Sequence, residues 1–466
     1  MTDPRYGRRT ALKLLGATAA LGGVGTAAAR RQEDKPKKGR LKKLGHSLLS
    51  DPPGGYTEGS IRSDGQYGVL GSFLGEGGSF LVDLSNPRDP TEVHRVPSSA
   101  DTRNADVKFD HRDGLYYRTQ EPNNEVGEGG IELVDYGWGD GTPEEPVVLS
   151  KLEADPTHNV FAHPEEPVLY ATNEEEADGG LEVWDVSDPA APSLVGSFGP
   201  KADLHDVVVD PERDYAHLAF IGGDRDEDAF LDGYVLMDVS DPMAPEEVGR
   251  FDYESRPDYT EKRLGNGEPG FESCHYADYD PERGLVVVGD EIGLGVPGGK
   301  HVLDIGWGDG TPEEPKHVGF TYSPNAEVMD EGIEFLDWTT HNHDIVPKGD
   351  TTILVDGGYR EGVWAADISD PTDPTPTDRY ATLDKVDEAN GMLIPENPPV
   401  AWSADYNRKR DLTLVADQVT GVYTFRAVPK PSSPDDAGGN EGRGNDNGRG
   451  NGRNRDSGKE DERGHG

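Results

Sequence analysis

Apolar and polar residues alternate along most of the chain in short runs, which Gly, Pro and Asp separate. Between residues 205 and 251 the runs read HDVVVD, YAHLAFI, GYVLMDV and EEVGRF. Short runs rich in β-branched and aromatic residues, bounded by turn-forming residues, predict strands. We find no run with the 3.6-residue period of an amphipathic helix. The pattern therefore predicts an all-β fold.

Seven segments of the chain repeat one pattern, in which a Gly precedes four mostly apolar residues and an Asp. They are GSFLVD ending at Asp83, GIELVD at Asp135, GLEVWD at Asp185, GYVLMD at Asp238, GKHVLD at Asp304, GVWAAD at Asp367 and, without the Asp, GVYTFR at Arg426. Four strand-like runs in each repeat of roughly 50 residues are typical of a β-propeller blade. We therefore expect an all-β, seven-bladed β-propeller.

The seventh repeat lacks a fourth strand, because its last apolar run ends at Phe425. The missing strand is expected from the other end of the chain. There, LKKLGHSLL at residues 41–49 resembles the fourth runs of other repeats, with Leu44 and Gly45 aligned to Val195 and Gly196. An N-terminal strand that completes the last blade would remove an open sheet edge. The closed propeller would then span residues 41–428.

One ten-residue segment, GWGDGTPEEP, occurs twice without change, at residues 137–146 and 306–315. Each copy follows the repeated strand at the place where four other repeats have a turn such as VSDPAAP. An Asp before a Pro-restricted corner is typical of an Asx turn, so we interpret the decamer as a second version of this turn. Its carboxylates leave a Ca²⁺ loop open as an alternative, although the spacing differs from that of known Ca²⁺ loops.

The charge of the chain narrows the classes of function. Its 466 residues include 90 acidic and 45 basic ones, for a formal charge of −45. This excludes a nucleic-acid binder that works through a basic patch. Such a charge destabilises a compact state unless salt screens it, so we expect a salt-adapted protein. Cys274 is the only cysteine in the sequence and allows no intrachain disulfide.

The two ends of the chain differ from its repeats. Arg8 and Arg9 precede an Ala- and Gly-rich run that ends in TAAAR, which resembles a twin-arginine export signal over residues 1–29. The run is too short for a membrane span. Residues 30–40 are expected to be a flexible linker, and residues 429–466 a disordered tail rich in Gly, Asn and Arg. We expect an extracellular or cell-surface protein.

The segments FLVDLS and IELVD resemble the LVIVD-repeat family, of the haloarchaeal type, and the resemblance covers nearly the whole chain beyond the signal. It implies a β-propeller and no single reaction. The chain is more distantly similar to selenium-binding and methanethiol-oxidase propellers. That similarity implies a copper ion held by histidines.

Histidines recur at one position of the first strand in consecutive repeats. Alignment of the Pro-Glu turns in HNVFAHPEE, HDVVVDPER and HYADYDPER places His158, His205 and His275 together. The match of HDIV to HDVV adds His343, and His341 precedes it by two residues on the same predicted face. Other repeats have Glu58, Ala105 and Trp402 at this position. First strands line the central channel of a propeller, so these side chains are expected to converge.

Imidazole nitrogens suit Cu, Zn, Fe and Ni. The sequence therefore predicts a transition-metal site formed by His158, His205, His275 and His343, with His341 and Glu58 as further candidates. We expect copper, with zinc or iron as alternatives. Histidines that only hydrogen-bond within the channel remain the competing interpretation. Cys274 is expected to point away from the channel as a small buried residue.

The sequence favours an exported, salt-adapted propeller that binds a transition metal and has redox or hydrolytic chemistry. The alternative is a non-catalytic interaction or scaffold protein of the cell surface. The residues do not decide between an enzyme and a binding protein, although a metal-dependent oxidoreductase is the favoured enzyme class. We expect a monomer without a transmembrane segment, and the small molecule or surface partner is not identified.

Overall fold

The structure is a computed structural model that describes twelve segments of the chain. These are residues 41–52, 54–73, 77–99, 101–123, 127–154, 157–173, 180–222, 231–257, 271–292, 298–324, 339–390 and 398–429. The expected signal peptide, linker and tail lie outside them, except for residue 429. Contacts divide the chain into Met1–Pro429 and Lys430–Gly466, and all described residues belong to the first unit.

The described residues form antiparallel sheets, most of them with four strands in chain order. The first is β2 (Tyr56–Ile61), β3 (Tyr67–Ser72), β4 (Ser79–Asp83) and β5 (Thr91–Val96). The second has five strands: β6 (Thr102–Arg103), β7 (Val107–Phe109), β8 (Leu115–Pro122), β9 (Gly130–Asp135) and β10 (Val147–Leu152). The third is β11 (Val160–Ala162), β12 (Val168–Thr172), β13 (Leu181–Asp185) and β14 (Ser193–Phe198).

The next two sheets repeat this order. The fourth is β15 (Leu204–Asp210), β16 (Tyr215–Ile221), β17 (Asp232–Asp238) and β18 (Glu246–Asp252), followed by the short 3-10 helix η1 (Tyr253–Ser255). The fifth is β19 (Cys274–Tyr279), β20 (Leu285–Asp290), β21 (Lys300–Asp304) and β22 (Lys316–Thr321). Every four-stranded sheet thus contains one copy of the sequence repeat.

The remaining strands form one eight-stranded sheet. Its strands are β23 (Thr340–Lys348), β24 (Thr351–Gly358), β25 (Gly362–Asp367), β26 (Thr375–Tyr380), β27 (Ala401–Asn407), β28 (Leu412–Asp417), β29 (Gly421–Ala427) and β1 (Leu41–Ser47), with the 3-10 helix η3 (Val386–Glu388) between β26 and β27. One parallel bridge, Asn342 to Ser403, joins β23 to β27. Apart from this bridge, the sheet consists of two antiparallel groups of four strands.

The N-terminal strand pairs with the last strand of the chain. β1 runs antiparallel to β29, with Leu41 opposite Ala427 and Ser47 opposite Val422. Leu41 packs against the same core cluster as Phe425. The pairing covers the edge of β29 that the seventh repeat would otherwise leave without a partner.

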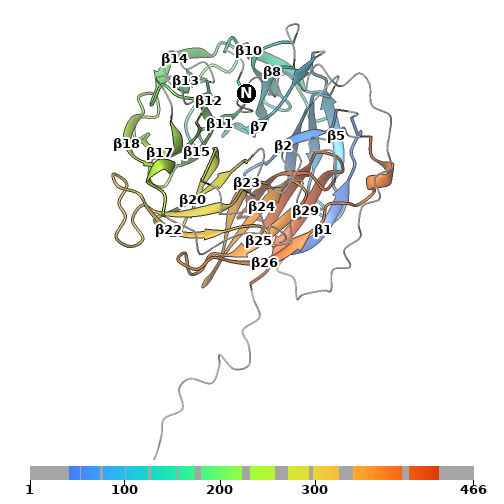
Figure 1. Cartoon of the computed structure of the whole chain (residues 1–466). Coiled ribbons are helices and arrows are strands. Elements are labelled where there is room, and N and C mark those ends of the chain that lie inside the picture. The colour runs from blue at the N-terminus through green and yellow to red at the C-terminus, as the bar shows by residue number, and fades with distance from the viewer. Residues whose placement is uncertain are drawn as a thin grey trace, which may run out of the picture. The chain divides into compact units, whose positions relative to one another are not determined.

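The innermost strands of successive sheets contact one another around a common centre, as Figure 1 shows. Contacts join β2 to β7, β7 to β11, β11 to β15, β15 to β19, β19 to β23, β23 to β27, and β27 to β2. The hydrophobic clusters lie between neighbouring sheets; one of them joins Tyr170 of β12 to Leu204 of β15. The middle strands are therefore buried on both faces, which explains apolar runs such as LVVV in β20.

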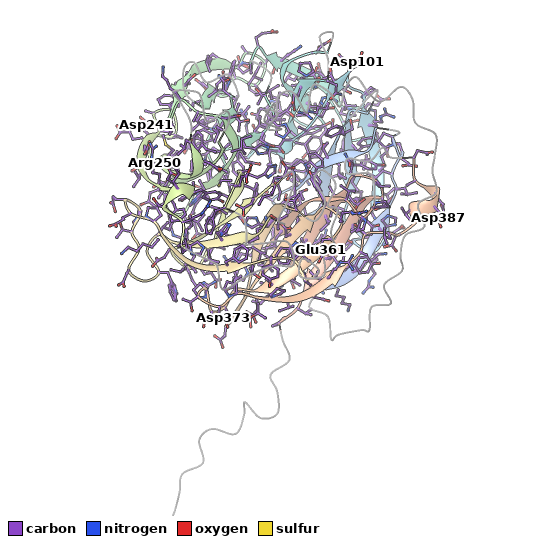
Figure 2. All side chains as sticks on the ribbon, in the orientation of Figure 1. Asp101, Asp241, Arg250, Glu361, Asp373 and Asp387 are labelled. Carbon is purple, nitrogen blue, oxygen red and sulfur yellow. The ribbon has the colours of Figure 1, made fainter. Side chains whose placement is uncertain are left out.

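Acidic side chains lie both at the periphery of the described sheets and inside them. Asp241 and Asp373, both in S-D-P-x-x-P turns, lie on the periphery of the described sheets, whereas Glu361 lies inside them (Figure 2). Glu361 is 1% exposed and pairs with Arg379. Among the described residues, we find no helix with the length and apolar character that a membrane crossing requires.

The duplicated decamer folds around the Asp that ends the repeated strand. In the second copy, Asp304 accepts hydrogen bonds from the backbone N–H groups of Gly306, Trp307, Gly308 and Gly310 at 2.6–2.9 Å. Asp135 accepts the same four bonds in the first copy. These bonds occupy both carboxylate oxygens of the Asp. The decamer is therefore a turn that hydrogen bonds to this Asp hold in place.

We expect Asp304→Ala to lower the melting temperature by a few degrees. Four backbone donors lose their acceptor, and water replaces it only in part, for a cost of about 2 kcal/mol. Asp309→Ala, an exposed change in the same loop, is the control and should leave the melting curve unchanged. Thermal unfolding followed by circular dichroism measures both variants, and equal curves would contradict this role of Asp304.

Candidate metal site

A bulge in the innermost strands decides which side chains reach the centre. In β15, Leu204 pairs with Phe220 and Asp206 with Ala219, so His205 is an extra residue. In β19, Cys274 pairs with Asp290 and Tyr276 with Gly289, so His275 is extra. A bulge sets two residues opposite one and interrupts the regular alternation of side chains. Two successive residues can therefore point the same way at this level of the strand.

Four imidazole rings lie next to one another in succession, and we call them the histidine row. It consists of His158, His205, His275 and His341. The ring centroids of neighbouring members are 4.8, 3.8 and 4.3 Å apart, in that order. His205, His275 and His341 are 9%, 2% and 3% exposed, and His158 is partly buried. The row therefore draws one ring from each of four consecutive sheets.

Hydrogen bonds to Nδ1 orient three rings of the row. The Nδ1 atom of His205 lies 2.9 Å from the carbonyl oxygen of His275, and that of His341 lies 2.5 Å from the carbonyl oxygen of Trp402. Carbonyl oxygens only accept, so Nδ1 donates in both rings and Nε2 carries the lone pair. In His158, Nδ1 lies 2.8 Å from a carboxylate oxygen of Glu121. Histidine ligands of metal ions are commonly held in this way.

A carboxylate completes a group of possible metal ligands. Oxygens of Glu291 lie 3.8 Å from Nε2 of His275 and 3.7 Å from Nε2 of His341. Ligand atoms of these three residues all lie within 4.8 Å of one another. Glu291 follows β20, and its backbone N–H donates to the carbonyl oxygen of Ser273 at 3.1 Å. The strand pairing thus places Glu291 beside the bulge at His275.

The environment of His275 and His341 keeps these two rings neutral. Burial lowers the pKa of His275 well below its usual value, and the neighbouring rings of His205, His341 and His158 lower it further. Burial also holds the pKa of His341 well below its usual value, although the bond to the Trp402 carbonyl acts in the opposite direction. Neutral rings offer the lone pair that a metal ion requires.

The sequence did not reveal Glu291, because it directly follows the second strand of its sheet and lies outside the aligned first strands. The only signal was indirect. A residue that pairs next to the bulge of the first strand reaches the same centre, and Glu291 has that position opposite Ser273. Recognising it required the location of the bulge.

The predicted register of the sixth repeat was wrong by two residues. His341, not His343, continues the row beside His275, at a centroid distance of 4.3 Å. The bulge of β23 lies between Thr340 and His343, so His343 points to the side opposite the row. There its Nδ1 accepts a hydrogen bond from Nζ of Lys300 at 2.9 Å. The dipeptide His341-Asn342, which repeats His158-Asn159, was the better alignment signal.

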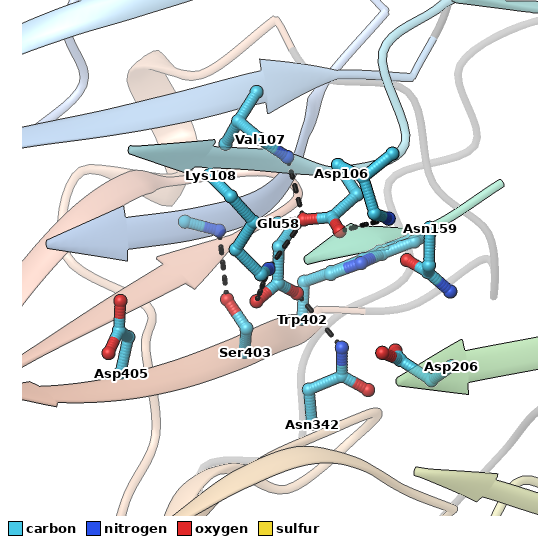
Figure 3. Close-up of polar contacts among 12 residues, drawn as sticks. Glu58, Asp106, Val107, Lys108, Asn159, Asp206, Asn342, Trp402, Ser403 and Asp405 are labelled. Atoms are coloured by element: carbon cyan, nitrogen blue, oxygen red, sulfur yellow. Dashed lines mark hydrogen bonds and ion pairs between the residues drawn. The ribbon is translucent and has the colours of Figure 1, made fainter. Parts of the chain in front are cut away.

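Glu58 lies near the centre but outside the histidine row. Its carboxylate accepts a hydrogen bond from the Asn342 amide at 3.0 Å and lies 3.4 Å from Nζ of Lys108 (Figure 3). Burial raises the pKa of Glu58 to about 7, although Lys108 lowers it. The first strand bulges between Tyr56 and Gly59, so this repeat contributes Thr57 and Glu58 and no ring to the row.

Cys274 packs away from the row, together with the aromatic residues Tyr253 and Phe271. Cys274 is fully buried in a hydrophobic cluster with Tyr253 and Phe271, the orientation that strand alternation predicts. Burial raises the pKa of its thiol well above the usual value.

Comparisons with known proteins bear on the fold. Residues 176–199 match the LVIVD repeat. The structure named "Structure of U3-55K" is similar, with a TM-score of 0.51, 10% sequence identity, and coverage of 83% of this chain and 98% of the other. No curated protein matches the sequence. The repeat match and the cyclic contacts of the inner strands describe a β-propeller repeat protein.

Two further structures are similar at a TM-score of 0.49. One is the C-terminal WD40 domain of Sif2, with 10% identity and coverage of 84% of this chain and 99% of the other. The second is the β-propeller domain of Cps50 (Swd1) from Myceliophteria thermophila, with 11% identity and coverage of 81% and 97%. At this distance they add nothing to the fold assignment, and none of the three similarities bears on function.

Proposed function

We propose that this β-propeller repeat protein binds one transition-metal ion through His275, His341 and Glu291. The observation that carries the proposal is the convergence of these three ligands within 4.8 Å. His205 and His158 continue the row beside them and offer further nitrogen ligands. Two imidazoles and one carboxylate suit iron and zinc, and additional imidazoles favour copper.

The proposed site is open to a small molecule. Three protein ligands leave coordination positions of a transition metal free, which is the arrangement of catalytic and not of structural sites. Bound copper or iron would supply redox chemistry, and we keep a metal-dependent oxidoreductase as the favoured enzyme class. The substrate is a small molecule that reaches the row.

The rest of the proposal concerns the whole chain. We take the seven groups of four principal strands as blades of one closed ring, with β1 as the outer strand of the seventh. The Arg8-Arg9 pattern supports export by the twin-arginine route to the cell surface or medium, and the charge of −45 supports adaptation to salt. The expected monomer remains part of the proposal.

A loading experiment tests the metal proposal. The full chain, stripped with a chelator and reloaded in turn with Cu, Zn and Fe, should retain close to one ion after desalting, as measured by elemental analysis. Glu291→Gln, which keeps the shape of the side chain, should weaken binding more than about 10-fold. Glu272→Gln, an exposed change nearby, should bind like the parent. A parent that retains no ion would end the proposal.

Exposed apolar residues favour a second candidate, a non-catalytic interaction or scaffold protein. Trp138 is 49% exposed and borders a surface hollow of about 380 Å³ with Val147, Val148 and Pro189. Exposed apolar groups of this kind often mark protein contacts. This candidate would take first place if the parent binds no metal.

A further inference from the structure

The bulges bring a second set of side chains to the centre, next to the histidine row. In each repeat, the member of this set follows the position that corresponds to the histidine row by one residue, and Figure 3 shows most of these residues. The set includes Glu58, Asp106, Asn159, Asp206, Asn342 and Ser403. We call the three carboxylates Glu58, Asp106 and Asp206, together with the neighbouring amide of Asn342, the acidic group. Its members come from β2, β15 and β23 and from the residue before β7, and all are buried.

One lysine neutralises part of the acidic group. Nζ of Lys108 lies 2.6 Å from a carboxylate oxygen of Asp106 and 3.4 Å from one of Glu58. Asp106 also accepts hydrogen bonds from the backbone N–H groups of Val107 and Val160. Asp106 is therefore well satisfied by donors of the protein.

Asp206 has far fewer partners. Among the described residues, its carboxylate receives one hydrogen bond, at 2.8 Å from the backbone N–H of Val207. The side chain is 3% exposed. An ionised carboxylate in such a place requires a positive partner. Lys108 lies against Asp106 and Glu58, and burial together with the neighbouring Asp106 raises the pKa of the Asp206 carboxyl well above its usual value.

The amide of Asn342 faces the same place. Its Nδ2 donates to Glu58 at 3.0 Å, which turns Oδ1 away from Glu58. Figure 3 shows this oxygen on the side of Asp206. Asn342 is 3% exposed, and its Oδ1 has no hydrogen-bond partner within the described structure. An amide oxygen and an ionised carboxylate both accept hydrogen bonds, so a cation, a water molecule or a proton on Asp206 that lies between them would satisfy both.

We propose that a divalent cation of the hard class, Ca²⁺ or Mg²⁺, binds between Glu58, Asp206 and the Oδ1 atom of Asn342. These ligands are all oxygens, which such cations prefer, and water completes their coordination. The site is separate from the one proposed at the histidine row, whose ligands are mainly nitrogens. It joins strands of three sheets, and its occupation is expected to stabilise the centre of the fold.

The test uses the full chain, stripped with a chelator and supplied with Ca²⁺ alone or Mg²⁺ alone at constant ionic strength. One of the two ions, at a hundredfold excess over its Kd, should raise the melting temperature by about 4 °C. Asp206→Asn and Asn342→Ala should each abolish most of this rise. Asp405→Asn is the matched control. Asp405 is a partly buried carboxylate in Figure 3 that accepts a hydrogen bond from the Ile61 N–H, and its variant should respond like the parent.

Three outcomes would overturn the proposal. The first is a parent whose melting curve and calorimetric titration respond to neither ion, which would indicate that Asp206 holds a proton instead. The second is an unchanged response in Asp206→Asn, which would place the ion elsewhere on this acidic chain. If Asp206→Asn fails to fold, Glu58→Gln replaces it in the test. The third outcome is then an unchanged rise of the melting temperature in Glu58→Gln. His275→Ala should respond like the parent, so the result does not depend on the metal proposal.

Discussion

Replacing His275 and His341 together with Ala should remove little more metal than replacing either one alone. Each single change leaves one imidazole and Glu291 at the core of the proposed site, and two ligands hold a transition metal poorly in competition with water. We expect each single variant to lose at least about 100-fold in affinity, beyond the 10- to 100-fold typical of groups that only orient a ligand. Elemental analysis at matched pH and salt measures the retained ion.

The control for this prediction is His343, which lies two residues after His341 on β23. His343→Ala should retain the ion, because His343 contacts Lys300 on the other side of the strand. Circular dichroism of each variant checks that the sheets remain intact. Additive losses from the two single variants, or loss of the ion in His343→Ala together with retention in His341→Ala, would contradict the site.

Deleting residues 41–50 should cause aggregation or lower the melting temperature by roughly 10 °C or more, since it exposes a sheet edge and uncovers core residues. β1 covers β29 along its length. Its Lys43 also bonds the hydroxyl of Tyr380 at 3.1 Å, and the ring of His46 packs at 4.3 Å from that of Tyr423. Differential scanning calorimetry and light scattering measure the effect.

A point variant keeps this prediction testable if the deletion does not fold. A Cβ atom at Gly45 would lie 2.5 Å from the carbonyl oxygen of Pro87, so Gly45→Val should push β1 from its place and show part of the loss. Lys42→Ala, an exposed change on the same strand, should leave the melting curve unchanged. A normal curve for the deletion would mean that the edge of β29 needs no partner.

The repeated pattern was sufficient to predict the strands and their order. Each Gly-to-Asp segment became the strand that pairs with the last strand of its group, from β4 beside β5 to β29 beside β1, because apolar residues that are buried on both faces dominate it. The match of Leu44-Gly45 to other fourth strands placed β1 beside the last repeat, where it pairs with β29. These features depend on the local order of apolar and polar residues, which can be read from the sequence alone.

The candidate site was only partly visible in the sequence. His158, His205 and His275 could be aligned, because each precedes its Pro-Glu turn at a similar distance. His343 was aligned in place of His341 because HDIV matches HDVV, and Glu58 in place of Thr57; neither alignment allowed for a break in the alternation of side chains along the inner strands. The bulges break that alternation and set two successive side chains toward the centre.

The sequence by itself determined the repeat, the β class and the histidines that recur in the first strands. Only the tertiary structure decided which atoms meet. Glu291 reaches His275 and His341 because β20 pairs with β19 beside a bulge, and Asn342 faces Asp206 because strands from different repeats adjoin at the centre. The physical reason is that periodicity sets the face of a side chain within one strand, whereas bulge position and contacts between sheets set its neighbours.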